Sequence, residues 1–170
     1  MRVRKSALAM AASIGAILGI VSNEGFSDKA YIPVPGDVPT IGYGSTKRDD
    51  GSPVQMGDTI TEPEAREKAV REIRSVYEAG LKKCLTDIPL TQGEYDALVD
   101  AAYNLGTAAV CKSGMVRNFK TGNYKAGCEY FLKYRFSQGR DCFLPENAKI
   151  CGGIKTRRIY EYRLCMGLVP

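Results

Sequence analysis

The most prominent apolar stretch of the chain lies at its N-terminus. The first five residues contain three cations, and residues 6–22 then carry no charge at all. This stretch is nearly long enough for a helix that spans a hydrocarbon core, which needs about twenty residues. The cationic flank predicts an N-terminus that stays in the cytoplasm while the rest of the chain is translocated. We therefore separate an N-terminal signal-anchor segment, residues 1–23, from a globular domain, residues 24–170.

Three fates are open for residues 6–22. A cleaved signal peptide needs small residues just before the mature start, and Ile20 and Ser22 make a poor site. A permanent anchor is normally richer in Leu, Ile and Phe than this Ala-, Gly- and Ser-rich stretch, whose insertion is only marginally favourable. The third fate is a helix that enters the bilayer and later leaves it. We favour this third interpretation.

The pattern beyond residue 23 begins with a hairpin. Prolines and a glycine between residues 33 and 39 exclude a helix there, and residues 40–43 have strand character. A short antiparallel hairpin within residues 24–46 follows from these two features.

The rest of the pattern is helical. Sequences of the capping-box form, at residues 61–64 and 91–94, open helices that run to about Lys83 and Asn104. Shorter helices are expected at 107–120 and 122–137, a loop at 138–153, and a last helix at 155–166. The predicted fold class is α+β: a mostly helical domain with one small sheet near its N-terminus.

The composition excludes several kinds of catalysis. The chain has no histidine, which rules out Ser-His-Asp and Cys-His mechanisms and hydrolases whose zinc is bound by histidine. Carboxylates, Lys, Tyr and Cys remain for acid–base chemistry. Nothing in the sequence implies a metal or an organic cofactor.

Six widely spaced cysteines follow an export-type N-terminus. An even number in that context predicts disulfides, formed in the periplasm or outside the cell. Cys142 and Cys151, which bracket a short loop, are the preferred pair, and the spacing leaves the other connectivities open.

The formal net charge of +5 suits an anionic partner such as a cell wall. Cations and anions are interspersed, and no basic run is interleaved with aromatic residues, so a nucleic-acid partner is not expected. We expect a monomer.

Residues 24–44, EGFSDKAYIPVPGDVPTIGYG, carry the first of four motifs that occur in a familiar order. The others are LTQGEYDALV at 90–99, YNLG at 103–106, and GIKTRR at 153–158 with Glu161 and Cys165. Together they resemble the phage lysozymes of glycoside hydrolase family 24, over about residues 24–166. The N-terminal segment resembles the signal-arrest-release segment of endolysins from lambdoid phages.

The resemblance implies a lysozyme-like fold and a muramidase that cuts the bond between N-acetylmuramic acid and N-acetylglucosamine in peptidoglycan. Glycoside hydrolysis needs a protonated carboxylic acid and a second carboxylate. Glu24, beside an apolar segment that would raise its pKa, is the predicted general acid. Asp37 is the predicted base that activates water, and Thr40 matches the threonine that positions the water.

The second acid departs from the commoner family pattern. There the aspartate follows the glutamate by nine residues, and that position is Pro33 here. Asp37 lies thirteen residues after Glu24, inside a Pro/Gly turn, where it is also a suitable turn residue. Asp28 is a poorer candidate for the base because it is only four residues from Glu24.

Two rival functions stay open at this point. One is a lytic transglycosylase that uses Glu24 alone, and the other is a non-catalytic, membrane-tethered wall-binding protein. The expected location is the host inner membrane, spanned once by residues 6–22, and then the periplasm after release.

Overall fold

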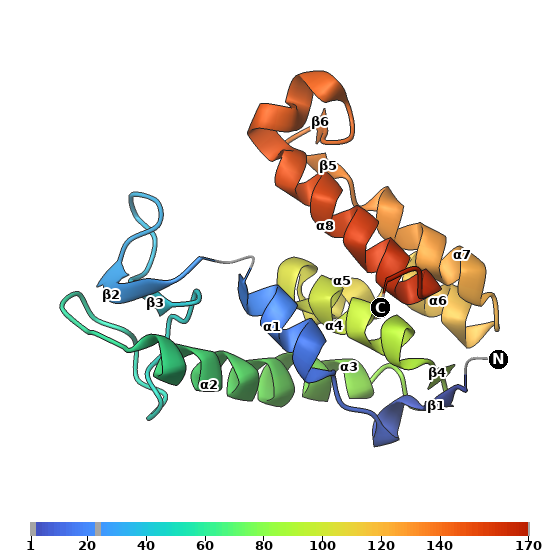
Figure 1. Cartoon of the computed structure of the whole chain (residues 1–170), viewed down its shortest axis with the longest axis horizontal. Helices are drawn as coiled ribbons and strands as arrows, with labels where there is room; N and C mark the ends of the chain where they lie inside the picture. Colours follow the sequence, from blue (N-terminus) through green and yellow to red (C-terminus); the bar gives the residue numbers. More distant parts are fainter. Residues whose placement is uncertain (1–2, 23–24, 170) are drawn as a thin grey trace. The chain divides into compact units, whose positions relative to one another are not determined.

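The structure is a computed structural model, and it describes residues 3–22 and 25–169 (Figure 1). Helices dominate these residues, and the strands are short. The elements in chain order are β1 (Lys5–Ser6), the 3-10 helix η1 (Ala7–Ala9), α1 (Ile14–Ser22), β2 (Ser27–Tyr31), β3 (Thr40–Gly42), α2 (Glu62–Glu72), the π-helical stretch η2 (Ile73–Glu78), α3 (Ala79–Lys82), β4 (Pro89–Leu90), α4 (Gln92–Leu105), α5 (Thr107–Cys111), α6 (Gly114–Lys120), α7 (Tyr124–Glu129), the 3-10 helix η3 (Tyr130–Lys133), β5 (Phe136–Ser137), β6 (Arg140–Asp141), the 3-10 helix η4 (Pro145–Asn147) and α8 (Ala148–Met166).

The chain forms two compact units. The small unit is Ile14–Val76, and the large unit combines Met1–Ser13 with Tyr77–Pro170. The predicted boundary at residues 23 and 24 is a different kind of division, between a membrane segment and a catalytic domain, and it stays a prediction.

The large unit is built around α4. Its capping box is formed as the sequence predicts: the Thr91 hydroxyl accepts a hydrogen bond from the Glu94 N–H, and the Glu94 carboxylate accepts one from the Thr91 N–H at 2.8 Å. Tyr95 and Leu98 are fully buried, and α4 packs against α8. Two satisfied N-terminal donors and a buried apolar face explain why this segment is a stable helix.

The small unit combines α1, the β2–β3 pair and α2. The capping box of α2 at Thr61 and Glu64 is also formed. Helix α1 packs against α2, while Ala30, Ile41 and Val54 form a separate small core beneath the strands. That core holds the hairpin on which Asp37 and Thr40 lie.

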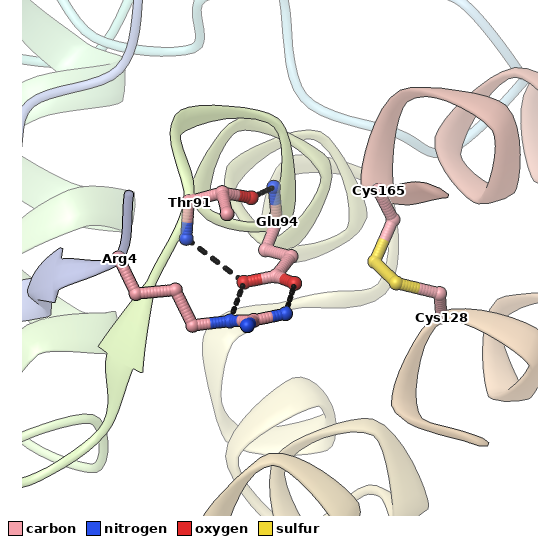
Figure 2. The surroundings of a disulfide bond; sticks show 5 residues. All are labelled: Arg4, Thr91, Glu94, Cys128 and Cys165. Carbon is pink, nitrogen blue, oxygen red and sulfur yellow. Dashed lines mark hydrogen bonds and ion pairs between the residues drawn. A yellow bond between two sulfur atoms is a disulfide. The ribbon is translucent and has the colours of Figure 1, made fainter. Parts of the chain in front are cut away.

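All six cysteines form disulfides. The pairs are Cys84–Cys111, Cys128–Cys165 and Cys142–Cys151. The preferred pair, Cys142–Cys151, is therefore confirmed, and Figure 2 shows the bond that ties α7 to the end of α8.

Residues 3–22 form part of both units instead of one continuous helix. Residues 5–6 pair with Pro89–Leu90 as a two-stranded sheet, and the Ala7 N–H donates to the Ile88 carbonyl. Only residues 14–22 are α-helical. No helix within the described ranges, 3–22 and 25–169, is both long and apolar enough to cross a membrane.

Three expectations were wrong. The described residues contain three two-stranded sheets instead of one. The helix expected at 122–137 ends as η3 at Lys133, because residues 136–137 pair with 140–141. The loop expected at 138–153 contains β6, η4 and the start of α8, which begins at Ala148 instead of residue 155.

Cys151 interrupts this helix with non-helical backbone angles (φ −141°), where its disulfide to Cys142 holds the chain against the adjacent hairpin.

Candidate active site

The β2–β3 hairpin positions two of the three predicted site residues. The strands are antiparallel, with Ser27 opposite Gly42 and Tyr31 opposite Thr40. Gly42 has a positive φ of 66°, and a Cβ at this position would lie 3.0 Å from the Ala65 side chain. Glycine therefore lets the end of β3 approach α2 closely, which fixes the base of the hairpin.

A tight turn between the strands carries Asp37. The Asp37 N–H donates to the Val34 carbonyl at 2.9 Å, with Pro35 second and Gly36 third in the turn. Gly36 has φ of 91°, the value that a type II turn requires at its third position. The PVPGD sequence thus dictates this turn, and the turn places Asp37 at its exposed end.

Asp37 and Thr40 are held by the same residue, Val38. The Asp37 carboxylate accepts a hydrogen bond from the Val38 N–H at 2.9 Å, and the Thr40 hydroxyl donates to the Val38 carbonyl at 3.2 Å. Asp37 is exposed, whereas Thr40 is only 6% exposed. The arrangement provides a solvated carboxylate next to an anchored hydroxyl whose lone pairs can accept a hydrogen bond from water.

Glu24, the predicted general acid, lies outside the described residues. Its role stays a prediction from the sequence. In the chain it precedes Gly25 and stands three positions before the first residue of β2.

The two hairpin tyrosines differ in their surroundings. Tyr43 is 7% exposed, its hydroxyl donates to Glu62 at 3.1 Å, and its ring lies 5.5 Å from that of Phe26. It is therefore a packing residue of the small unit. Tyr31 is 42% exposed and remains available to a ligand.

A pocket of about 300 Å³ lies beside β3 in the small unit, and Ile41 is one of its lining residues. Its charged lining residues are largely paired with one another, as in the Arg48–Asp58 ion pair at 2.6 Å and the Lys68–Asp49 pair at 3.2 Å. Neither Asp37 nor Thr40 lines it. We interpret this pocket as a structural feature of the small unit, because the charges of its lining residues neutralise each other.

Three residues of the later motifs meet in the large unit. Arg158 donates to the Asn104 side chain at 2.8 Å and pairs with Glu161 at 2.7 Å, and both ionic groups are fully buried. Burial raises the pKa of Glu161 well above its usual value and lowers that of Arg158. The YNLG and GIKTRR motifs thus contribute to one buried polar cluster.

The sequence motifs gave no sign of a second polar cluster in the large unit. Three buried carboxylates accept hydrogen bonds from the N-terminal segment: Glu94 from Arg4, Glu78 from the Ala12 N–H, and Asp96 from Ser13. Glu94 was visible in the sequence as a capping-box residue, but nothing in the pattern indicated the donors that the three carboxylates receive from the N-terminal segment.

Comparison with known proteins agrees with this fold and these motifs. The family model of phage lysozyme matches residues 21–161. The chain belongs to the phage lysozyme family. The endolysin of Salmonella phage P22 is 34% identical over 141 residues, which cover 82% of this chain and 94% of the relative. The endolysin of Bacillus phage B103 is 35% identical over 146 residues, but these cover only 50% of that longer protein.

The fold also has counterparts among solved structures. The endolysin from Escherichia coli O157:H7 phage FAHEc1 superposes with a TM-score of 0.74 at 28% identity, over 95% of this chain and 96% of that one. The lysozyme-like, mostly helical α+β fold is therefore confirmed. The chain is a glycoside hydrolase, a phage endolysin that degrades peptidoglycan, and the non-catalytic alternative is set aside.

Proposed function

We propose that this endolysin is a muramidase that hydrolyses the β-1,4 bond between N-acetylmuramic acid and N-acetylglucosamine. Glu24 protonates the leaving oxygen, Asp37 removes a proton from the attacking water, and Thr40 orients that water. The main support is the shared anchoring of Asp37 and Thr40 on Val38. An inverting hydrolase needs its second carboxylate far enough from the acid to admit a water.

Three variants test this assignment by the clearing of outer-membrane-permeabilised Gram-negative cells. Glu24→Gln should abolish lysis, because the amide is nearly isosteric but delivers no proton. Asp37→Asn should slow lysis by about a hundredfold or more. Asp28→Asn is the matched control: Asp28 is an exposed carboxylate of β2, and its loss should leave the rate unchanged.

The outcomes separate the assignments clearly. Lysis by Glu24→Gln at the wild-type rate would remove the acid from the mechanism. If the Asp37→Asn protein lost less than about tenfold while Asp28→Asn lost more, Asp37 would be only a turn residue.

The reaction products distinguish hydrolysis from the transglycosylase alternative. A hydrolase adds water to the glycosidic bond and leaves reducing muramic ends. A transglycosylase uses the sugar's own 6-hydroxyl instead and leaves 1,6-anhydro ends. Mass spectrometry of digested peptidoglycan should detect reducing ends only, and anhydro ends would assign the chain to the transglycosylases.

We also propose that the enzyme first spans the host inner membrane through residues 6–22, with its N-terminus in the cytoplasm, and passes to the periplasm after release. The uncharged, Ala- and Gly-rich composition of the segment supports marginal insertion. The folded protein supports a second state for the same residues. Ala7 and Ile17 are fully buried in it, and the Ser13 N–H and hydroxyl both donate to Asp96, at 2.9 and 2.7 Å.

The consequence for activity follows from the two compact units. Residues 3–13 belong to the large unit and residues 14–22 to the small one. While residues 6–22 lie in the bilayer, both units lack part of their structure, and the membrane surface holds Glu24 close to the lipid. Catalysis tolerates displacement of a reacting group poorly, so the tethered enzyme should be inactive.

A pair of Gly→Leu variants tests release. Gly15 is exposed and a Cβ there meets no atom within 4 Å, so Gly15→Leu strengthens insertion without a clash. Gly153→Leu is the matched control, because Gly153 is also helical, exposed and unobstructed. After depolarisation, cells that express Gly15→Leu should lyse later than wild type, and cells with Gly153→Leu should not. Equal timing of all three, with uncleaved chains confirmed by mass, would contradict release from the membrane.

A further inference from the structure

The basic hairpin region, residues 133–155, has no role in the proposed reaction. It carries five Lys and Arg residues against two acidic residues, a net charge of +3 out of +5 for the whole chain. The region lies at the N-terminal end of α8 in the large unit and contains β5 and β6 (Figure 1). This net charge equals that of the first five residues, which carry three cations and no acidic residue.

The fold holds this region in one conformation. Phe136 pairs with Asp141 and Ser137 with Arg140 across the strands, and the Cys142–Cys151 disulfide closes the following loop. Asp141 and Arg135 neutralise each other in an ion pair at 2.8 Å, which leaves four cations and one acidic residue and keeps the net charge at +3. The strand pair and the disulfide thus pre-order the backbone that carries the remaining cations, which lowers the entropy cost of binding a partner.

Large apolar side chains of the same region are also exposed. Phe136 is 62% exposed, Ile150 64% and Leu144 44%. The Arg135 guanidinium lies 5.6 Å from the centre of the Phe136 ring. Exposed aromatic and aliphatic residues beside cations are the combination that inserts at the surface of an anionic bilayer.

We propose that the basic hairpin region binds the surface of an anionic lipid membrane. Its cations neutralise acidic headgroups, and Phe136 and Ile150 enter the boundary between headgroups and acyl chains. A soluble polyanion would use the cations alone and leave the apolar side chains in water. The coincidence of both features favours the lipid surface. This contact is independent of the N-terminal segment and operates in the folded enzyme.

The charge contribution is tested with the full chain and sedimented vesicles. Vesicles of phosphatidylethanolamine with phosphatidylglycerol should bind the protein, and vesicles of phosphatidylcholine should not. Arg140→Gln with Lys149→Gln should weaken binding about twenty-fivefold, at about fivefold for each cation. The control pair Lys112→Gln with Lys120→Gln removes the same charge from exposed positions of the large unit outside this region and should bind like wild type.

The apolar contribution is tested by replacing Phe136 and Ile150 with Ser. This double variant should also bind the anionic vesicles more weakly, while Met56→Ser with Val76→Ser, two comparably exposed sites in the small unit, should not. Loss in the control pairs equal to that in the test pairs would overturn the proposal, since net charge or general hydrophobicity would then decide binding. Sensitivity to the Gln changes but not to the Ser changes would overturn it in favour of a soluble polyanion.

Discussion

The ion pair between Arg4 and Glu94 joins the start of the chain to a residue 90 positions later (Figure 2). Its nitrogen–oxygen distances are 2.7 and 3.1 Å, which make it a two-point contact. The Glu94 side chain is 4% exposed and that of Arg4 35%. Arg4 also lies 3.5 Å above the Tyr124 ring. This pair should contribute more to stability than surface pairs do.

The perturbation is Arg4→Met, which keeps an apolar stem and removes the guanidinium. A hydrogen bond to a charged group is worth about 1.5–3 kcal/mol, and the loss of one leaves the other group buried without its partner. Partial exposure of Arg4 reduces this value, whereas the lost cation–π contact adds about 0.5–1 kcal/mol. We expect the free energy of unfolding to fall by about 2–3 kcal/mol.

The assay is urea unfolding followed by circular dichroism, in a double-mutant cycle with Glu94→Gln. The glutamine keeps an oxygen for the Thr91 N–H, so the cycle isolates the charged contact. The coupling energy should be about 1–2 kcal/mol. Arg66→Met is the matched control: Arg66 pairs with Glu62 on an exposed helix face and its loss should cost at most about 0.5 kcal/mol. If Arg4→Met cost no more than Arg66→Met, the reasoning about burial would be refuted.

Two further predictions concern disulfides and acid stability. In the chain-entropy model, the loss of a disulfide lowers the free energy of unfolding more when it closes a longer loop. Replacing Cys128 and Cys165, separated by 37 residues, with Ser should cost about 4 kcal/mol, and replacing Cys142 and Cys151, separated by 9, about 3 kcal/mol. Thermal unfolding should rank the two variants in this order, and the reverse ranking would contradict the model. Asp58 has its pKa lowered from 3.8 to about 2, chiefly by hydrogen bonds from an arginine, so its contribution to stability is present above pH 4 and is lost as the pH falls to about 2. Asp58→Asn should therefore flatten the dependence of stability on pH in that window, as measured by urea midpoints, and an unchanged slope would exclude this carboxylate as the cause.

The local features of this protein follow from its sequence. The capping boxes at Thr61 and Thr91 begin helices because one side chain satisfies a backbone donor within four residues. The turn that carries Asp37 follows from Pro35 and Gly36, because these residues restrict the backbone locally. The family motifs were also visible, since their order along the chain needs no knowledge of contacts.

Other features depended on partners far away in the chain. Cys142–Cys151 was predictable because only a short loop separates the two, whereas the other two pairs join separate helices. The early start of α8 was missed because Gly152 and Gly153 have low helix propensity, and because the helical turn before them is joined to the rest of α8 across a kink at Cys151 that no sequence pattern marks.

The N-terminal segment shows most clearly what the sequence alone does not determine. From its composition, residues 6–22 are apolar enough for marginal insertion into lipid and small enough to pack inside a protein, so sequence alone does not separate the two states. Only the tertiary structure supplies the partners of the folded state: Glu78, Asp96 and Glu94, which accept hydrogen bonds from residues 12, 13 and 4. A buried carboxylate needs such a donor, and the chain must fold before the donor and the acceptor meet.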